Sequence, residues 1–133
     1  MLIRDLDHIN IRTARLDEMV AWYEARLGLT RGSRPDFGFP GAWLYAGDRA
    51  LVHLVGVDRE PASDGSDLKL EHGAFRAAGY SDFVASLRAA GEAFHVADVP
   101  GMDIVQVNVW DPDGNHLHLD FDAAEVDGPD RAG

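Results

Sequence analysis

The sequence predicts an α+β fold in which two βαβββ modules form a cupped mixed sheet with the helices on its outer face. The first observation is that strand-like alternation and helix-like periodicity follow one another in the same order twice. The second is an internal repeat. With an offset of about 64 residues, Leu6-Asp7-His8 falls on Leu70-Glu71-His72. With one residue more, Val52-His53-Leu54 falls on Leu117-His118-Leu119. The chain is therefore predicted to be a duplicated module.

The first module is predicted to span residues 1–57. Apolar and polar residues alternate in its first strand, and apolar residues then recur at helical spacing up to a glycine that ends the helix. The loop after this helix carries Phe37 and Phe39, which we expect to be buried and to cover a pocket. The predicted elements are a strand over 6–12, a helix over 16–27 ended by Gly28, a loop over 32–41, and a hairpin of 42–46 and 50–55.

A polar, breaker-rich linker over residues 58–67 separates this module from the second, which is predicted to span residues 68–121. The two modules together form a single domain over 1–121, and the acidic tail over 122–133 is expected to be flexible. The predicted elements are a strand over 70–76, a helix capped by Ser81 and stopped at Gly91, strands over 93–97 and 104–110, an Asp-Pro-Asp-Gly-Asn turn over 111–115, and a final strand up to Phe121.

Composition narrows the classes of function. The formal net charge of −11 would repel phosphate backbones, so nucleic acid is not an expected partner. We expect no membrane span, because no apolar run is long enough, and a cytoplasmic location, because the start of the chain lacks the features of a signal peptide. Cysteine is absent, so any metal ion must be bound by nitrogen or oxygen.

Four histidines occupy two pairs of equivalent positions in the repeat. By strand parity, all four point away from the apolar face that packs on the helices, toward the inside of the curled sheet. Neutral imidazoles on neighbouring strands are ligands that a first-row divalent ion accepts. The predicted metal ligands are His8, His53, His72 and His118. His95 and His116 are expected to be ordinary hydrogen-bonded residues.

Further polar and aromatic side chains are candidates for substrate binding. Trp43 and Trp110 either line a pocket or belong to the core. Arg12 and Arg76 either hold a substrate carboxylate or are solvated at strand ends. The full set of candidates is Asn10, Arg12, Trp43, Arg76, Gln106, Asn108 and Trp110.

Three segments carry a resemblance to a known family. They are Leu6-Asp7-His8-Ile9 at the start of a strand, Trp22-Tyr23-Glu24-Ala25-Arg26-Leu27-Gly28-Leu29 at the end of a helix, and Asp111-Pro112-Asp113-Gly114-Asn115 before the last strand. Together they resemble the vicinal oxygen chelate superfamily, which contains glyoxalase I, extradiol dioxygenases, fosfomycin-resistance proteins and metal-free bleomycin-binding proteins. The resemblance implies paired βαβββ modules around a divalent metal, in a homodimer whose site lies within one chain or across two.

Carried over by position, His8 and His72 match the first-strand ligands of the family, and His53 and His118 match its last-strand ligands. Glyoxalase I-like proteins usually have glutamate at both of the latter positions, so this chain replaces carboxylates by neutral imidazoles. We expect an ion held this way to be a stronger Lewis acid.

The expected function is a metal-dependent, glyoxalase-like lyase or isomerase acting on a small oxygen-chelating substrate through an enolate-like intermediate. His53 and His118 are the expected catalytic residues, with a ligand-site imidazole or bound water moving the proton. Zn, Ni, Fe, Mn and Co all suit such a site. Two alternatives remain: an extradiol-type dioxygenase with a histidine-rich Fe(II) site, and a metal-free small-molecule-binding protein.

Overall fold

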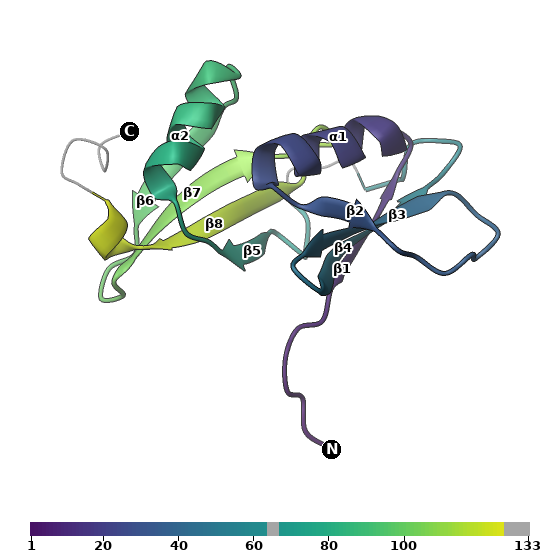
Figure 1. Ribbon diagram of the computed structural model, residues 1–133, viewed down its shortest axis with the longest axis horizontal. Helices are drawn as coiled ribbons and strands as arrows, with labels where there is room; N and C mark the ends of the chain where they lie inside the picture. The colour runs from purple at the N-terminus through teal and green to yellow at the C-terminus, as the bar shows by residue number, and fades with distance from the viewer. Residues whose placement is uncertain (64–66, 127–133) are drawn as a thin grey trace. The chain divides into compact units, whose positions relative to one another are not determined.

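The computed structural model describes residues 1–63 and 67–126, and the chain divides into two units (Figure 1). Unit 1 comprises Met1–Ser66 and unit 2 comprises Asp67–Gly133. Each unit contains one strand, one helix and then three strands, and its four strands form one mixed sheet. The paired βαβββ architecture predicted from the sequence is therefore confirmed. In the part of the chain that the structure describes, no helix has the length and apolarity that crossing a bilayer requires.

In unit 1, helix α1 covers one face of the sheet (Figure 1). Its residues Met19 and Tyr23 are fully buried, as are Leu44 and Leu54 of the sheet. The strands lie in the order β1-β4-β3-β2, with β1 parallel to β4 and the other neighbours antiparallel. The elements are β1 (Ile9–Thr13), α1 (Leu16–Leu27), β2 (Thr30–Gly32), β3 (Gly41–Ala46) and β4 (Arg49–Gly56).

Unit 2 repeats this topology with the order β5-β8-β7-β6, and β5 is parallel to β8. Helix α2 packs on its sheet through Tyr80, whose ring meets that of Phe121 edge to face with centroids 5.5 Å apart. The elements are β5 (Gly73–Arg76), α2 (Tyr80–Ala89), β6 (Phe94–Asp98), β7 (Ile104–Trp110), β8 (His116–Asp122) and a short 3-10 helix (Ala123–Glu125).

Strand register shows that the duplication extends to single residues. Asn10 of β1 stands opposite His53 of β4, and Ala74 of β5 stands opposite His118 of β8. These two pairs are related by the same offsets of about 64 and 65 residues that align the two modules. On the other side of each histidine stand Trp43 and Asn108, respectively. Each unit therefore presents a histidine in the middle of its sheet, on the face opposite to its helix.

Both first strands begin later than the sequence predicts. The predicted strands started at residues 6 and 70, whereas β1 starts at Ile9 and β5 at Gly73. Pairing with the parallel neighbour begins only at these two residues. The preceding Leu6 and Leu70 are 70% and 83% exposed. The alternation of apolar and polar residues in the sequence thus begins before the residues that pair with the parallel neighbour.

Helix α2 begins differently from the prediction. Ser81 was expected to be its N-cap, but the helix already starts at Tyr80 with Gly79 as the cap residue, in the left-handed region at φ 88°. The Gly79 N–H donates to Glu125 Oε1 at 2.8 Å. A carboxylate distant in sequence therefore takes the place of the local serine cap.

The predicted tail is ordered at its start. Strand β8 continues to Asp122, whose Oδ1 accepts from Ala124 N at 2.9 Å and caps the 3-10 helix. The next residue after that helix, Val126, is buried. The rest of the predicted tail, 127–133, and residues 64–66 of the predicted linker lie outside the described residues.

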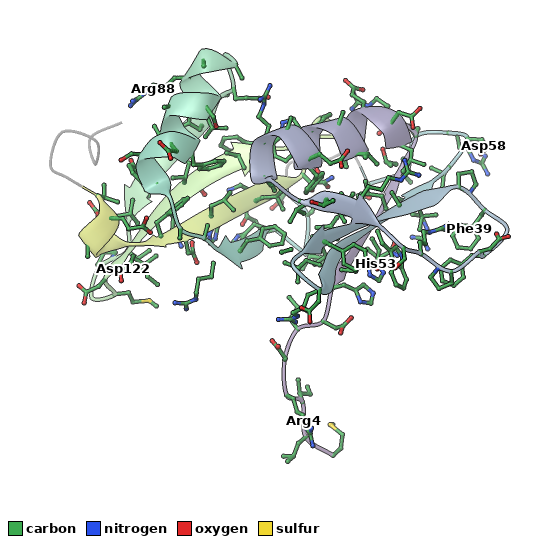
Figure 2. The ribbon with its side chains drawn as sticks, viewed as in Figure 1. Arg4, Phe39, His53, Asp58, Arg88 and Asp122 are labelled. Carbon is green, nitrogen blue, oxygen red and sulfur yellow. The ribbon has the colours of Figure 1, made fainter. Side chains whose placement is uncertain are left out.

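The aromatic loop between β2 and β3 is more exposed than predicted, as Figure 2 shows at Phe39. Phe37 and Phe39 are 48% and 46% exposed. Their rings stack on each other at 5.4 Å, and the Arg34 guanidinium lies 4.9 and 5.1 Å from the two ring centroids. The phenylalanines are therefore held by each other and by a cation rather than by burial in the core.

The turn before β8 is held by one buried carboxylate, and this generates a prediction about stability. Asp111 Oδ1 accepts hydrogen bonds from Asp113 N at 3.0 Å and Asn115 N at 2.9 Å. Asp111→Ala should lower the free energy of unfolding by about 2 kcal/mol, because two backbone donors lose a charged acceptor. Urea denaturation measures this. The exposed turn residue Asp48 is the control, and Asp48→Ala should cost less than about 0.5 kcal/mol; equal losses would contradict the role of Asp111.

Candidate functional site

Unit 1 contains a stack of three rings at the start of β1. The rings of His8 and His53 lie 3.7 Å apart with an interplanar angle of 10°. On its other face His53 meets Trp43 at 4.1 Å and 13°. His53 is 8% exposed, since both faces of its ring are covered. Only the edge of this imidazole is available for hydrogen bonding or for a ligand.

His8 lies just before β1, in a segment fastened to β4 by an arginine. Arg49 donates to Leu6 O at 3.2 Å and to Asp5 Oδ2 at 3.3 Å. Within that segment, Asp7 Oδ2 lies 2.6 Å from His8 Nδ1. The hydrogen bond from His8 lowers the pKa of Asp7, so the carboxyl remains ionised and acts as the acceptor. His8 therefore donates from Nδ1 and leaves Nε2 without a proton when the ring is neutral.

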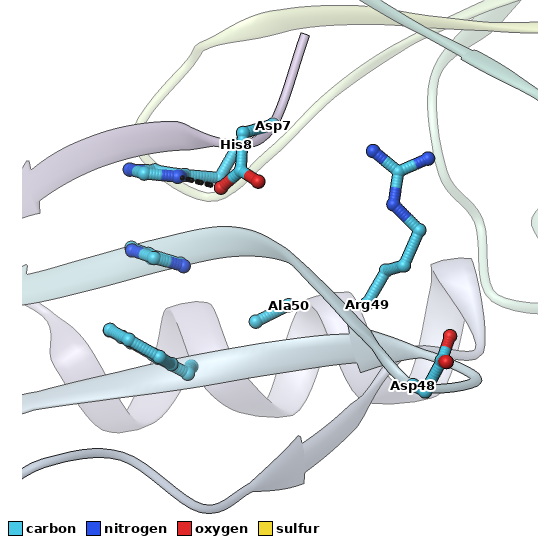
Figure 3. A pocket seen from close by; sticks show the side chains of 7 residues that line it. Asp7, His8, Asp48, Arg49 and Ala50 are labelled. Carbon is cyan, nitrogen blue, oxygen red and sulfur yellow. Dashed lines mark hydrogen bonds and ion pairs between the residues drawn. The ribbon is translucent and has the colours of Figure 1, made fainter. Parts of the chain in front are cut away.

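These side chains border an open pocket of about 500 Å³ (Figure 3). It combines the ring stack with charged groups of both signs. The lining residues are Asp7, His8, Trp43, Asp48, Arg49, Ala50 and His53. A pocket of this kind offers an aromatic wall and several hydrogen-bonding groups to a small molecule.

Burial sets the protonation of His53. Loss of contact with water lowers the pKa of His53 from its ordinary value of 6.5, and the neighbouring His8 lowers it further. A hydrogen bond with the backbone of Ala50 acts in the opposite direction but does not outweigh burial. His53 is therefore neutral near pH 7, the state in which imidazole binds a metal ion or accepts a proton.

Unit 2 places His72 and His118 together in a similar way. Their ring centroids are 4.3 Å apart with an interplanar angle of 47°. His118 is 5% exposed, and its Nδ1 lies 2.7 Å from Asp120 Oδ1. His72 Nδ1 makes a short hydrogen bond to Glu71 Oε2. Both histidines are thus held from Nδ1 by a carboxylate, as His8 is in unit 1.

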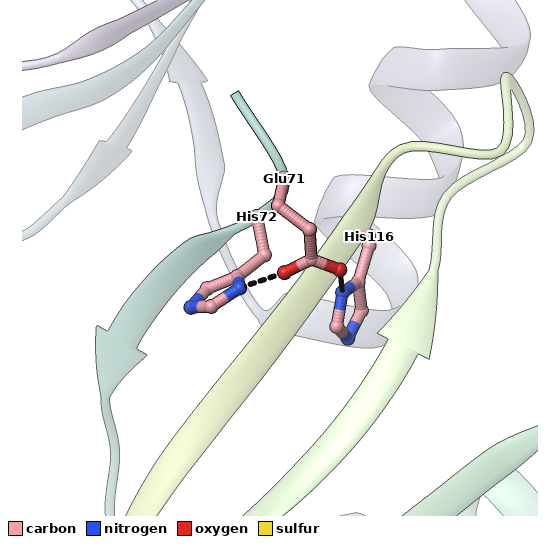
Figure 4. A group of neighbouring side chains, drawn as sticks. All are labelled: Glu71, His72 and His116. Atoms are coloured by element: carbon pink, nitrogen blue, oxygen red, sulfur yellow. Dashed lines mark hydrogen bonds and ion pairs between the residues drawn. The ribbon is translucent and has the colours of Figure 1, made fainter. Parts of the chain in front are cut away.

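His116 adds a third imidazole to this cluster (Figure 4). Its Nδ1 lies 2.7 Å from Glu71 Oε1, and its Nε2 lies 2.8 Å from Asn108 Oδ1. Glu71, His72 and His116 bring one ligand atom each within 4.8 Å of one another. Hydrogen bonds from His72 and then His116 lower the pKa of Glu71, so its carboxylate accepts from both rings.

The hydrogen bonds of these histidines fit a transition-metal ion. His8, His72 and His118 each bond a carboxylate through Nδ1 and keep Nε2 for a ligand. Metal-binding histidines in proteins commonly have this carboxylate partner, which fixes the tautomer and raises the basicity of the ring.

The structure distributes the predicted site residues between these two groups. In unit 1 it brings together His8, His53 and Trp43, while Asn10 and Arg12 are exposed on β1. In unit 2, Trp110 stacks on His116 at 5.3 Å. His72 and His118 lie together in the cluster, and Asn108 contacts His116. Arg76 and Gln106 both stand opposite Asp120 in the sheet.

The prediction from sequence omitted the carboxylates. Asp7 and Glu71 precede equivalent histidines, and this recurrence of an acidic residue before histidine is a signal that could have found them. Asp120 follows His118 by two residues, so strand alternation places both side chains on the same face of β8 and could have identified Asp120 as a partner. His116 was expected to be an ordinary hydrogen-bonded residue, and both of its ring nitrogens do form hydrogen bonds.

Comparison with solved structures shows the same fold in several bacterial proteins. A glyoxalase family protein from Bacillus anthracis superposes with a TM-score of 0.73 at 19% identity, covering 92% of this chain and 98% of that one. A glyoxalase/dioxygenase from Nostoc punctiforme gives 0.70 at 20% identity, covering 90% and 91%. A fosfomycin resistance protein from Listeria monocytogenes gives 0.68 at 14% identity, covering 90% and 94%.

No curated protein sequence matches the chain significantly. A family model, however, matches residues 5–119, which is most of the sequence. The match begins just before the first histidine, His8, and ends one residue after the last, His118. The resemblance to the vicinal oxygen chelate proteins is confirmed: the chain belongs to the Glyoxalase/Bleomycin resistance protein/Dioxygenase superfamily.

Proposed function

We propose that this protein is a metal-dependent enzyme of the superfamily, a glyoxalase-like lyase or isomerase that acts on a small oxygen-chelating substrate. The observation that carries the proposal is the hydrogen bonding of the histidines. Three of them are held from Nδ1 by a carboxylate, and the fourth, His53, is kept neutral by burial. Superfamily membership supports the reaction class, because its members include glyoxalases and dioxygenases.

The proposed ligands are His8 and His53 of unit 1 and His72 and His118 of unit 2. A divalent transition ion held by such imidazoles would supply a Lewis acid that stabilises negative charge on a substrate oxygen. The donor set is made of neutral nitrogens, which Zn, Ni, Fe, Mn and Co all accept, although softer ions prefer it more strongly. The carboxylates of Asp7, Glu71 and Asp120 would hold the rings in orientation.

The proton-moving groups in this proposal are His53 and His118. His53 is neutral near pH 7 and can accept a proton at its exposed ring edge. His118 would accept a proton at Nε2 when that nitrogen is not bound to the ion, with its Nδ1 proton still bonded to Asp120 at 2.7 Å, so the carboxylate would stabilise the positive charge that develops on the ring. The low exposure of both rings keeps water from competing for these positions.

Substrate binding is assigned to side chains on the same faces as the histidines. Trp43 lines the pocket of unit 1 and would stack against a planar group. Arg12 and Arg76 would attract an anionic substrate oxygen. The other proposed substrate-binding residues are Asn10, Gln106, Asn108 and Trp110.

The first test is metal binding by untagged protein, measured by elemental analysis after saturation with Zn, Ni, Co or Fe(II) and gel filtration. His118→Ala and His72→Ala should each weaken the affinity by more than the roughly 10- to 100-fold that loss of an outer-shell partner costs, because each removes a ligand. His95→Ala is the matched control, since this exposed histidine lies on β6, outside the proposed ligand set. Saturated wild-type protein that carries no ion would leave a metal-free binding protein as the surviving assignment.

A second test separates the two reaction classes. Protein loaded with Ni, Zn or Mn should convert small α-keto or thioester compounds without consuming oxygen. Protein loaded anaerobically with Fe(II) and mixed with a catechol should show no oxygen uptake when air is admitted. Oxygen uptake with ring cleavage would replace the lyase or isomerase assignment with an extradiol dioxygenase.

The lowered pKa of His53 predicts a pH dependence of stability in the metal-free protein. Below about pH 6.5 the unfolded chain binds a proton at this residue before the folded chain does, so protons favour unfolding. The contribution of His53 is therefore fully present above the unfolded pKa and is lost as the pH falls toward the lower folded pKa. His53→Gln should show a smaller loss of stability over this interval in urea titrations. An unchanged slope would mean that His53 is not held neutral by burial.

A further inference from the structure

Glu71 is shared by two imidazoles, which distinguishes unit 2 from unit 1. One carboxylate oxygen accepts from His116 at 2.7 Å, and the other accepts from His72 (Figure 4). In unit 1, Asp7 accepts from His8, and the position equivalent to His116 in the repeat is Leu51. The second imidazole on the carboxylate is therefore a property of one module only.

His116 is itself anchored on its far edge and on one face. Its Nε2 lies 2.8 Å from Asn108 Oδ1, and Asn108 Nδ2 donates to the carbonyl oxygen of His95 at 3.2 Å. Because a carbonyl can only accept, this second bond fixes which end of the amide faces His116. Trp110 stacks on the ring at 5.3 Å with an interplanar angle of 15°. These contacts connect β6, β7 and β8 to Glu71 beside β5.

We infer that His116 is a positioning residue: it holds the Glu71 carboxylate so that His72 keeps its proton on Nδ1 and presents a bare Nε2. This inference rests on the proposed function, in which His72 is a metal ligand. Glu71 is an ionised acceptor, so Nδ1 of His116 carries the N–H that meets it, and the contact with Asn108 holds the other edge of the ring. The ring of His116 therefore connects Asn108 to Glu71 and limits the movement of the Glu71 carboxylate.

Direct metal binding by Glu71 and His116 is the competing explanation, since their ligand atoms lie within 4.8 Å of His72. The hydrogen bonds favour the positioning role. An ion bound there would have to displace two ring N–H donors from Glu71 and would leave Asn108 without its partner. The positioning role keeps all of these bonds and leaves His72 Nε2 available.

The decisive experiment reads the tautomer of His72 by NMR in metal-free protein labelled with 15N at histidine. Wild-type His72 should show a single neutral form with the proton on Nδ1. His116→Leu copies the residue found in unit 1, and it should give a mixture of the two tautomers because Glu71 loses its anchor. His8 serves as an internal control in the same spectrum, since its partner is Asp7. His95→Leu, on β6, should leave the His72 signals unchanged.

His116→Gln distinguishes the two roles. A glutamine can donate to Glu71 but is a poor substitute for imidazole as a transition-metal ligand. The positioning role predicts that metal affinity falls about tenfold in His116→Leu and largely recovers in His116→Gln. Equal losses in both variants would assign His116 to the metal and overturn the inference.

The remaining outcomes are also decisive. An unchanged His72 tautomer in folded His116→Leu would refute the positioning role. Should that variant fail to fold, Asn108→Ser removes the far anchor of the same ring and must produce the tautomer mixture. Wild-type protein that binds no metal would refute the proposed function, while the tautomer measurement, made without metal, would still decide whether His116 orients His72.

Discussion

The bond between a carboxylate and Nδ1 of a histidine is the interaction on which the candidate site depends. It occurs between Asp7 and His8, between Glu71 and His72, and between Asp120 and His118. In each case an ionised acceptor determines which ring nitrogen carries the proton and which is left for a ligand. A histidine held in this way is oriented before any ligand arrives, so less conformational entropy is lost on binding.

The sheet supplies the second constraint. Because β1 pairs with β4 and β5 with β8 in equivalent registers, each unit brings the histidine just before its first strand beside one from its last strand. A shift of one residue in either pairing would turn these side chains toward the helix-covered face. The parallel pairing therefore positions the imidazoles, and the packing of α1 and α2 on the opposite faces stabilises that pairing.

Histidines at positions 53 and 118 give the candidate ligands of each unit a different distribution of charge from a glutamate-containing set. The carboxylates are still present, but they lie one hydrogen bond further out, as Asp7, Glu71 and Asp120. The ion would then keep more of its charge toward a substrate oxygen, while the partner carboxylates make the rings better donors. In the proposed function, this arrangement would favour polarisation of an oxygen-containing substrate and would leave proton transfer to imidazole.

Sequence alone predicted the repeat, α1 with its terminal Gly28 and the turn at Asp111, because periodicity and turn chemistry are local. It did not predict that the pairing of β1 with β4 begins only at Ile9, nor the capping of α2 by Glu125, which is distant in sequence. The environment of Phe37 was not predicted either, because the Arg34 guanidinium lies over its ring instead of the core. At the candidate site, the equivalent positions in the repeat identified His8 and His72. The hydrogen bond from His116 to Glu71 could not be predicted, because it depends on β8 lying beside β5.

Our proposal is that carboxylate-held imidazoles are the ligands of a metal ion. X-ray absorption of the metal-loaded protein tests it most directly. We expect the nearest neighbours of the ion to be mainly histidine nitrogens at about 2.0 to 2.1 Å, with the multiple scattering that imidazole rings produce. A shell dominated by carboxylate oxygens, or a spectrum of an ion surrounded only by water, would contradict it.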